Sequence, residues 1–311
     1  MSDSNNPLRR RALIKMVSSA AEIMQDAPRT EDLAFLARQL VQATLPHTDP
    51  GDVEVWMRRD GTARLMIRRG IDATGKPLGL PYGSLPRLLL YWVTTEAVRT
   101  QSPSLVLGRS LNDFMIELGL NPATGGGKRG DAKRLRDQMI RLFSASITCA
   151  EVAGDANTGG FRRADMPIAT ELSLWWSKNP DERGLWESGI TLSDEFFRTT
   201  LAAPVPLDMR ALRALKRSPL ALDLYSWCAY NAFRAHHSGA ARWITWDNLA
   251  RALGADYATT KDFRRYVLKE LRKVQAHFPG LKLGKRRGCL EVLPTSTPAV
   301  MPRINVDKPK G

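Results

Sequence analysis

Lysine and arginine with little compensating acid gather in two short segments of the chain. Residues 128–141 hold six Lys or Arg against two Asp, and residues 259–287 hold ten against two acidic residues. These two segments carry +12 of the formal net charge of +14. Guanidinium and ammonium groups at this density neutralise phosphates, and in the major groove they also pair with guanine O6 and N7. The charge pattern favours double-stranded DNA as the partner.

The second basic segment has the apolar spacing of an amphipathic helix over residues 259–278. Five apolar side chains fall within roughly 40° of one line at about 100° per residue: Phe263, Val267, Leu271, Val274 and Phe278. The basic side chains lie on the opposite face or at its edges. Those near the N-terminus of the helix are expected to contact bases: Lys261, Arg264, Arg265 and Lys269. Arg272 and Lys273 are expected to contact phosphates.

A hairpin is predicted after this helix. Pro279 and Gly280 end the helix, and two short apolar runs then flank the tip Lys285, Arg286 and Arg287. A basic hairpin that follows a DNA-reading helix occupies the place of a wing, so these three residues complete the predicted DNA surface.

The first basic segment predicts a less regular helix, from Asp131 to about Phe143, that buries Leu135, Met139 and Leu142. Its exposed face mixes basic residues with Asp137 and Ile140, so it is expected to hold the DNA backbone and to read fewer bases. The basic residues predicted for this module are Lys128, Arg129, Lys133, Arg134, Arg136 and Arg141.

Both basic helices have similar elements around them. In the first half, a helix over 84–100, a short strand at 105–107 and a helix capped by Ser110 precede the basic helix. The runs ASITCAEV and ATELSLWW are then expected to form a ribbon around a tip at 154–160. In the second half, a strand near 188–192 and a helix from Ser193 come first. A long helix over 218–233, a strand at 243–245 and a helix capped by Asp247 then lead to the basic helix.

This order predicts an α+β protein with two tandem winged-helix domains and β-hairpin wings. Residues 1–30 are expected to be a flexible basic arm, and residues 296–311 a disordered tail. The first domain, 31–180, would dimerise and hold the DNA backbone, and the second, 185–295, would bind specific sequence. Within the first, 31–44 is expected to be an amphipathic helix, and the following run VEVWMRRDGTARLMIRRG a hairpin turning at Asp60-Gly61.

The composition excludes several classes of protein. The 311 residues suit two domains of about 100–150 residues. No apolar run approaches the roughly 18 residues that span a bilayer, and the basic N-terminus has no apolar segment behind it, as a signal peptide would. Three widely spaced cysteines and four histidines make a zinc site or a disulfide framework improbable. A reducing cytoplasm is expected.

Three weaker signals could suggest catalysis. Gly125-Gly126-Gly127-Lys128 lacks the spacing of a nucleotide-binding loop, and a flexible turn explains it better. His236 and His237 have no third metal ligand nearby in the sequence. Asp194 and Glu195 lie in the first turn of a helix, where acids favour the helix dipole. No nucleophile, acid–base pair or metal cluster is evident, so we expect no enzyme activity and no cofactor.

Several stretches of the chain resemble a known family. They are GLPYGSLPRLLLYWVTTEAVRT, LVLGRSLNDFMIELGL, GGKRGDAKRLRDQMIRLFSASI, SPLALDLYSWCAYNAF and ITWDNLARALG. Together they are similar to the plasmid-encoded RepA replication initiators over roughly residues 31–295. The resemblance implies two winged-helix domains that bind directly repeated origin sites (iterons), open the adjacent duplex and bring in the host initiator and helicase. It also implies autorepression by dimers and initiation by monomers.

The sequence and the resemblance together predict a non-enzymatic initiator of plasmid replication that binds duplex DNA. Charge and spacing by themselves predict only a DNA-binding protein with two modules. For each basic helix, the alternative interpretation is a solvent-exposed face that binds nothing. Three rivals remain: a winged-helix transcriptional repressor without a replication role, a relaxase- or primase-like enzyme, and a partition-type protein that coats DNA.

Overall fold

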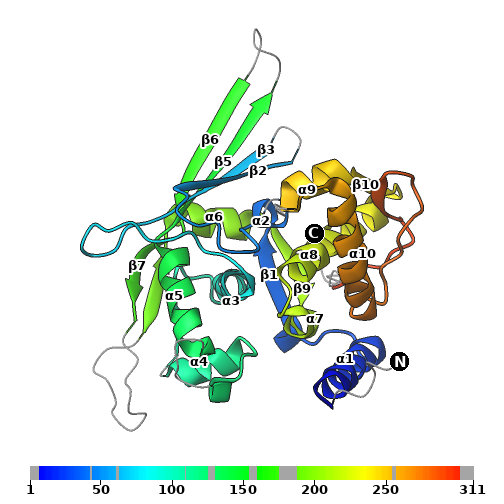
Figure 1. Cartoon of the computed structure of the whole chain (residues 1–311), viewed down its shortest axis with the longest axis horizontal. Helices are drawn as coiled ribbons and strands as arrows, with labels where there is room; N and C mark the ends of the chain where they lie inside the picture. The colour runs from blue at the N-terminus through cyan, green and yellow to red at the C-terminus, as the bar shows by residue number, and fades with distance from the viewer. Residues whose placement is uncertain are drawn as a thin grey trace, which may run out of the picture.

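The chain folds as an α+β protein in which two groups of helices and sheets meet at one central strand pair (Figure 1). The computed structural model describes residues 7–42, 44–60, 63–108, 110–124, 130–153, 160–174, 188–253 and 257–301. Among these residues no helix is long and apolar enough to cross a membrane.

The central pair consists of two strands that lie far apart in the sequence. Strand β1 (Leu33–Ala37) runs antiparallel to β9 (Pro204–Asp208), with Phe35 opposite Pro206. A short helix follows each strand: α2 (Arg38–Gln42) after β1, and α7 (Met209–Leu215) after β9. The helix expected over 31–44 is therefore wrong in its first half, because residues 33–37 bond to a distant strand edge.

The first unit is the set α3, β4, α4, α5, β7 and β8. Its three strands form one sheet in the order β4–β8–β7. Ser110 caps α4 as expected, because its Oγ accepts a hydrogen bond from Asp113 N at 3.1 Å. The elements are α3 (Ser84–Thr100), β4 (Ser104–Val106), α4 (Leu111–Glu117), η2 (Pro122–Thr124), α5 (Asp131–Phe143), β7 (Ala169–Ser173) and β8 (Gly189–Leu192).

The expected ribbon has different partners in the structure. Strand β5 (Ser146–Ala153) pairs with β6 (Gly160–Pro167), whereas β7 pairs with β8. The other edge of β5 bonds to β3 (Ala63–Arg68), which forms the expected hairpin with β2 (Val55–Asp60). The result is a four-stranded sheet in the order β2–β3–β5–β6, from which β5 and β6 project as a long hairpin (Figure 1).

Strand β8 also crosses the expected boundary between domains at residues 180–185. It was expected to begin the second domain, but its hydrogen bonds join it to β4 and β7 of the first unit. The helix after it, α6 (Asp194–Ala202), packs on α3, β1 and β6. Strand β8 and helix α6, up to Ala202, therefore belong by contact with the first unit.

The second unit is the set α8, β10, α9, α10 and β11, together with residues 281–284. Strand β10 pairs with β11, and residues 281–284 run back along β11, since Gly284 N donates to Glu291 O at 2.9 Å. The order of elements thus repeats that of the first unit. The bounds are α8 (Pro219–Ser238), β10 (Arg242–Thr245), α9 (Trp246–Leu253), α10 (Thr260–Ala276) and β11 (Cys289–Val292).

A buried ion pair joins the two units. Arg87 on α3 binds both carboxylate oxygens of Asp223 on α8 at 2.7 Å, and His47 Nε2 lies 2.8 Å from Asp223 Oδ2. Burial would raise the pKa of Asp223, but Arg87 and the hydrogen bond from His47 outweigh it and lower that pKa. Burial lowers the pKa of His47. Beside this group, Tyr91 Oη lies 2.9 Å from Ser226 Oγ.

Both ends of the described chain are ordered against the second unit, unlike the expected arm and tail. Helix α1 (Pro7–Gln25) and the 3-10 turn η1 (Thr30–Asp32) precede β1. On α1, Ser19 Oγ lies 3.0 Å from His277 Nε2, at the C-terminal end of α10. After β11, Ser296 is fully buried, and its Oγ accepts a hydrogen bond from Lys282 N and donates one to Lys282 O. Residues 1–6 and 302–311 lie outside the described residues.

Candidate nucleic-acid interface

Helix α10 forms as the sequence predicts because its ends and one face are fixed locally. Thr259 Oγ1 accepts from Asp262 N at 3.1 Å and so caps the N-terminus. Thr260 Oγ1 donates to Asp247 Oδ1 at 2.6 Å, which ties the start of α10 to the start of α9. The five predicted apolar side chains are all buried, against α8 and α9: Phe263, Val267, Leu271, Val274 and Phe278.

The opposite face of α10 presents most of the predicted basic side chains to solvent. Arg264 lies over the Trp246 ring of α9 at 5.6 Å, and Arg265 pairs with Asp262 at 3.3 Å. Lys273 departs from the prediction, because it is half-buried and its Nζ bonds the buried Glu270 at 2.7 Å. The exposed basic residues of α10 are Lys261, Arg264, Arg265, Lys269 and Arg272.

The three basic residues at the tip of the hairpin after α10 differ in how they are held. Arg286 is held in place: its Nε lies 3.3 Å from Glu291 Oε1, its backbone N donates to Glu291 Oε2 at 3.2 Å, and its guanidinium lies 4.7 Å from the Trp243 ring centroid. Lys285 and Arg287 are exposed on either side of it. Arg286 therefore fixes the shape of the tip, whereas Lys285 and Arg287 are presented outward.

Trp243 and Glu291 are functional candidates that the sequence prediction did not include. They face each other across β10 and β11, and Trp243 remains 50% exposed. A Cβ at Gly284 would lie 2.0 Å from a carboxylate oxygen of Glu291, so glycine is needed for this carboxylate to reach the tip. A large aromatic on the outer face of a strand opposite an acid was the signal available in the sequence.

Helix α5 buries the three predicted apolar side chains, Leu135, Met139 and Leu142, while Lys133, Arg134 and Arg136 are exposed. Arg134 pairs with Asp131 at 3.4 Å. Asp137 is exposed as expected, and Ile140 is only partly so. The exposed face of α5 therefore holds fewer cations than that of α10, and acids lie beside them.

Arg141 does not belong to the exposed face on which it was predicted. Its Nη1 donates to Leu80 O at 3.3 Å, and its guanidinium lies over the Tyr82 ring at 5.4 Å. The side chain folds against the loop before α3, where a Cβ at Gly79 would meet it at 2.5 Å. Lys128 and Arg129 lie outside the described residues.

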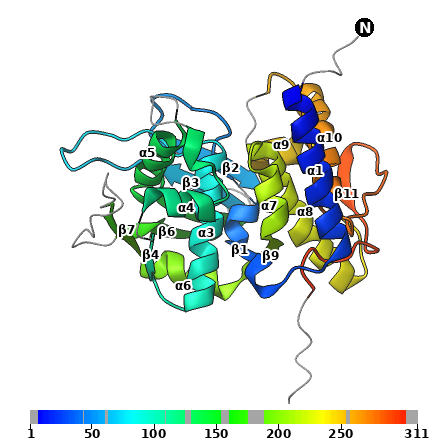
Figure 2. The ribbon, with the colours of Figure 1, turned by 90° about the horizontal axis from the view of Figure 1, so that it is seen from below.

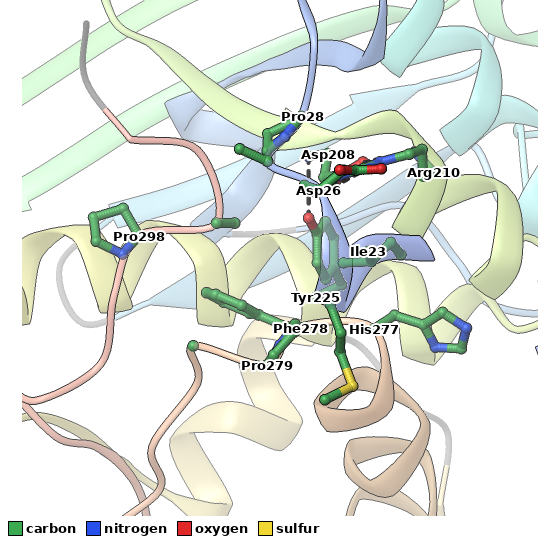
Figure 3. Close-up of a pocket in the computed structure, with 14 residues that line it drawn as sticks. Ile23, Asp26, Pro28, Asp208, Arg210, Tyr225, His277, Phe278, Pro279 and Pro298 are labelled. Atoms are coloured by element: carbon green, nitrogen blue, oxygen red, sulfur yellow. Dashed lines mark hydrogen bonds and ion pairs between the residues drawn. The ribbon is translucent and has the colours of Figure 1, made fainter. Parts of the chain in front are cut away.

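A small pocket of about 140 Å³ lies where α1, α7, α8, the end of α10 and the C-terminal segment meet (Figure 3). Tyr225 Oη accepts from Asp208 N at 3.0 Å, and Arg210 Nη2 bonds Asp208 Oδ2 at 2.8 Å. Burial raises the pKa of Tyr225, and the hydrogen bond to Asp208 raises that of Arg210. These polar groups bind one another and tie the elements together. In the described part of the chain, no three His, Cys, Asp or Glu gather as a metal site would require.

Comparison with known proteins places the chain in a family. The family model described as plasmid encoded RepA protein matches residues 80–248, more than half of the chain. The chain therefore belongs to the family of plasmid-encoded RepA proteins, as the sequence resemblance predicted. No curated protein matches the chain.

The solved structures similar to this chain include the selenomethionine form of domain 2 and domain 3 of RctB. It shares 15% sequence identity, covers 81% of this chain and 94% of its own, and gives a TM-score of 0.47.

Proposed function

We propose that this protein initiates plasmid replication by binding directly repeated sites in the origin. The observation that supports this most is the exposed basic face of α10, formed by Lys261, Arg264, Arg265, Lys269 and Arg272 beside the hairpin tip. An α-helix fits the major groove, where these side chains reach base edges and phosphates. Membership of the RepA family gives the binding its context in replication.

Each unit acts as a winged-helix module in this proposal. The order helix, strand, helix, basic helix, then a hairpin whose last strand pairs with the first, is present twice: as β4–β8–β7 with α5, and as β10–β11 with α10. In the first unit the wing is the β7–β8 hairpin rather than the β5–β6 hairpin. Two such helices enter successive major grooves about 34 Å apart, so one protomer covers roughly two turns.

The later steps follow from binding several protomers side by side. Bending the site costs some kcal/mol, which protein–DNA contacts repay, and the strain promotes opening of adjacent AT-rich duplex. The host initiator and the replicative helicase then assemble on the open region. In the same proposal, the protein acts without chemistry of its own, and dimers repress its promoter while monomers initiate.

Footprinting of the purified protein on its own replicon's DNA, at about 150 mM salt with random competitor, tests the proposal. A series of evenly spaced protected direct repeats beside an AT-rich stretch is the expected result. A single protected palindrome over a promoter would instead identify a repressor, and uniform weak protection would identify a coating protein. Nicking of supercoiled DNA in magnesium would identify a DNA-processing enzyme.

A further inference from the structure

Helix α1 lies beside the second unit and is fixed to it at its C-terminal half. The Ser19 hydroxyl bonds Nε2 of His277, whose Nδ1 donates to Lys273 O at 2.9 Å, so α1 is tied to the last turn of α10. After α1, Arg210 Nη2 donates to Asp26 O at 3.0 Å. Ile23 packs against the hydrophobic core. These contacts set the direction in which the first half of α1 extends.

That direction is toward the side of the molecule on which both basic helices lie. Figure 2 shows the N-terminal end of α1 at the same side as α5, α9 and α10, whereas α6 lies at the opposite side. Arg9 is ten residues before Ser19, which corresponds to about 15 Å along a helix. The start of α1 thus extends well beyond its anchor at the end of α10.

The sequence of the first half of α1 is strongly basic. Arg9, Arg10, Arg11 and Lys15 are present, while Glu22 is the one acidic residue in the sequence of α1. None of the four has an acid three or four positions away. Two exposed arginines outside the proposed DNA surface do have one, because Arg99 pairs with Glu96 and Arg198 pairs with Glu195. Cations near a helix N-terminus also oppose the helix dipole.

We propose that the first half of α1 is a third DNA-binding element, which contacts phosphates beside the segment of duplex bound by α10. This inference rests on the proposed function. It extends the interface beyond the two basic helices and the hairpin, to a helix outside the region of the family match. Because phosphates are the same along any duplex, the contact adds affinity without adding sequence preference.

The salt dependence of DNA binding by the full chain tests the inference. The probes are a 40-bp duplex spanning the strongest wild-type footprint and a random 40-bp duplex. Arg10→Gln with Arg11→Gln is expected to reduce the magnitude of the negative slope of log K against log salt by about 2. At 150 mM salt the affinity should then fall roughly 10- to 30-fold, equally on both probes.

Two matched variants separate phosphate contact from other causes. Arg10→Lys with Arg11→Lys keeps both charges, and should bind nearly as wild type does, because a point charge suffices for a phosphate. Arg99→Gln with Arg198→Gln removes two charges that already pair with Glu96 and Glu195, and should leave the slope unchanged.

Three outcomes would overturn the inference: an unchanged slope in the α1 glutamine variant, an equal loss in the lysine variant, or an equal loss in the Arg99 and Arg198 variant. A wild-type protein that protects no discrete site would instead contradict the proposed function. The random duplex still reports on α1 in that case, so the two failures are distinguishable. A misfolded variant is recognised by a lowered urea midpoint.

Discussion

Helices α5 and α10 occupy the same place in their units, but they use their basic residues differently. On α10, five exposed cations lie on one face, and Trp246 and Asp262 orient two of them. On α5, three cations are exposed beside Asp137, and Arg141 folds inward against Leu80 and Tyr82. The same order of elements therefore supports two surfaces, one suited to close contact with bases and one suited to holding the backbone.

The largest expected effect comes from removing the buried ion pair between Arg87 on α3 and Asp223 on α8. This pair joins the two units that carry α5 and α10. Arg87→Met leaves Asp223 buried without its main partner. The free energy of unfolding should fall by about 3–5 kcal/mol, as measured by urea denaturation. Adding Asp223→Leu should restore most of it, because the buried charge is then gone. A loss below about 1 kcal/mol for Arg87→Met would show that the units do not depend on this pair.

A matched pair of arginines compares the two basic helices directly. Arg265 and Arg134 are both exposed and both pair with an aspartate three residues before them, at 3.3 and 3.4 Å. Arg265→Ala should cost about 1–3 kcal/mol on the specific site and much less on random DNA. Arg134→Ala should weaken binding to the specific site and to random DNA equally. Equal behaviour of the two variants in a competition binding assay would remove the distinction between the helices.

Arg141 tests which basic residues of α5 belong to the DNA surface. Arg141→Gln should reduce stability by about 1 kcal/mol, because the bond to Leu80 O is lost. The salt slope of DNA binding should stay as in wild type, whereas Arg136→Gln should lower it by about 1. A lowered slope in Arg141→Gln, measured by titration at several salt concentrations, would return this residue to the DNA surface.

The smallest expected effect is a pH dependence of the protein's stability that arises from His47, which contacts Asp223 of the buried ion pair. Burial holds the pKa of His47 below its ordinary value of 6.5, so the unfolded chain takes up this proton first as the pH falls. Stability from His47 is present above pH 6.5 and is lost below it. The urea midpoint should therefore fall between pH 7 and pH 5, and fall less in His47→Gln. Parallel profiles for the two proteins would show that His47 does not contribute.

The parts of the fold that depend on nearby residues could be predicted from the sequence. Helix α10 was placed within two residues at each end, because its cap, its apolar stripe and the Pro279-Gly280 stop all lie within one segment. The hairpin over 281–293 follows for the same reason. The buried and exposed faces of both basic helices required only the helical period.

Features that depend on distant partners were missed. Residues 33–37 have an apolar run that fits a helix or a strand, and β9 decides between them. The β5–β6 pairing could not be told from the expected pairing of β5 with the later run at 169–176, since alternation alone does not select a partner. Arg141 is charged and on a basic helix, and the loop that covers it is 60 residues earlier in the chain.

The pairing of β1 with β9 also has a consequence for how the chain is made. Phe35 meets Pro206, which is synthesised 171 residues later. Until then β1 exposes an unpaired edge, and closing so long a loop slows folding. The central pair therefore closes only after every element of the first unit has been synthesised. A fragment that contains only one of these two strands would have a bare strand edge, which invites aggregation or strand exchange with a neighbouring copy.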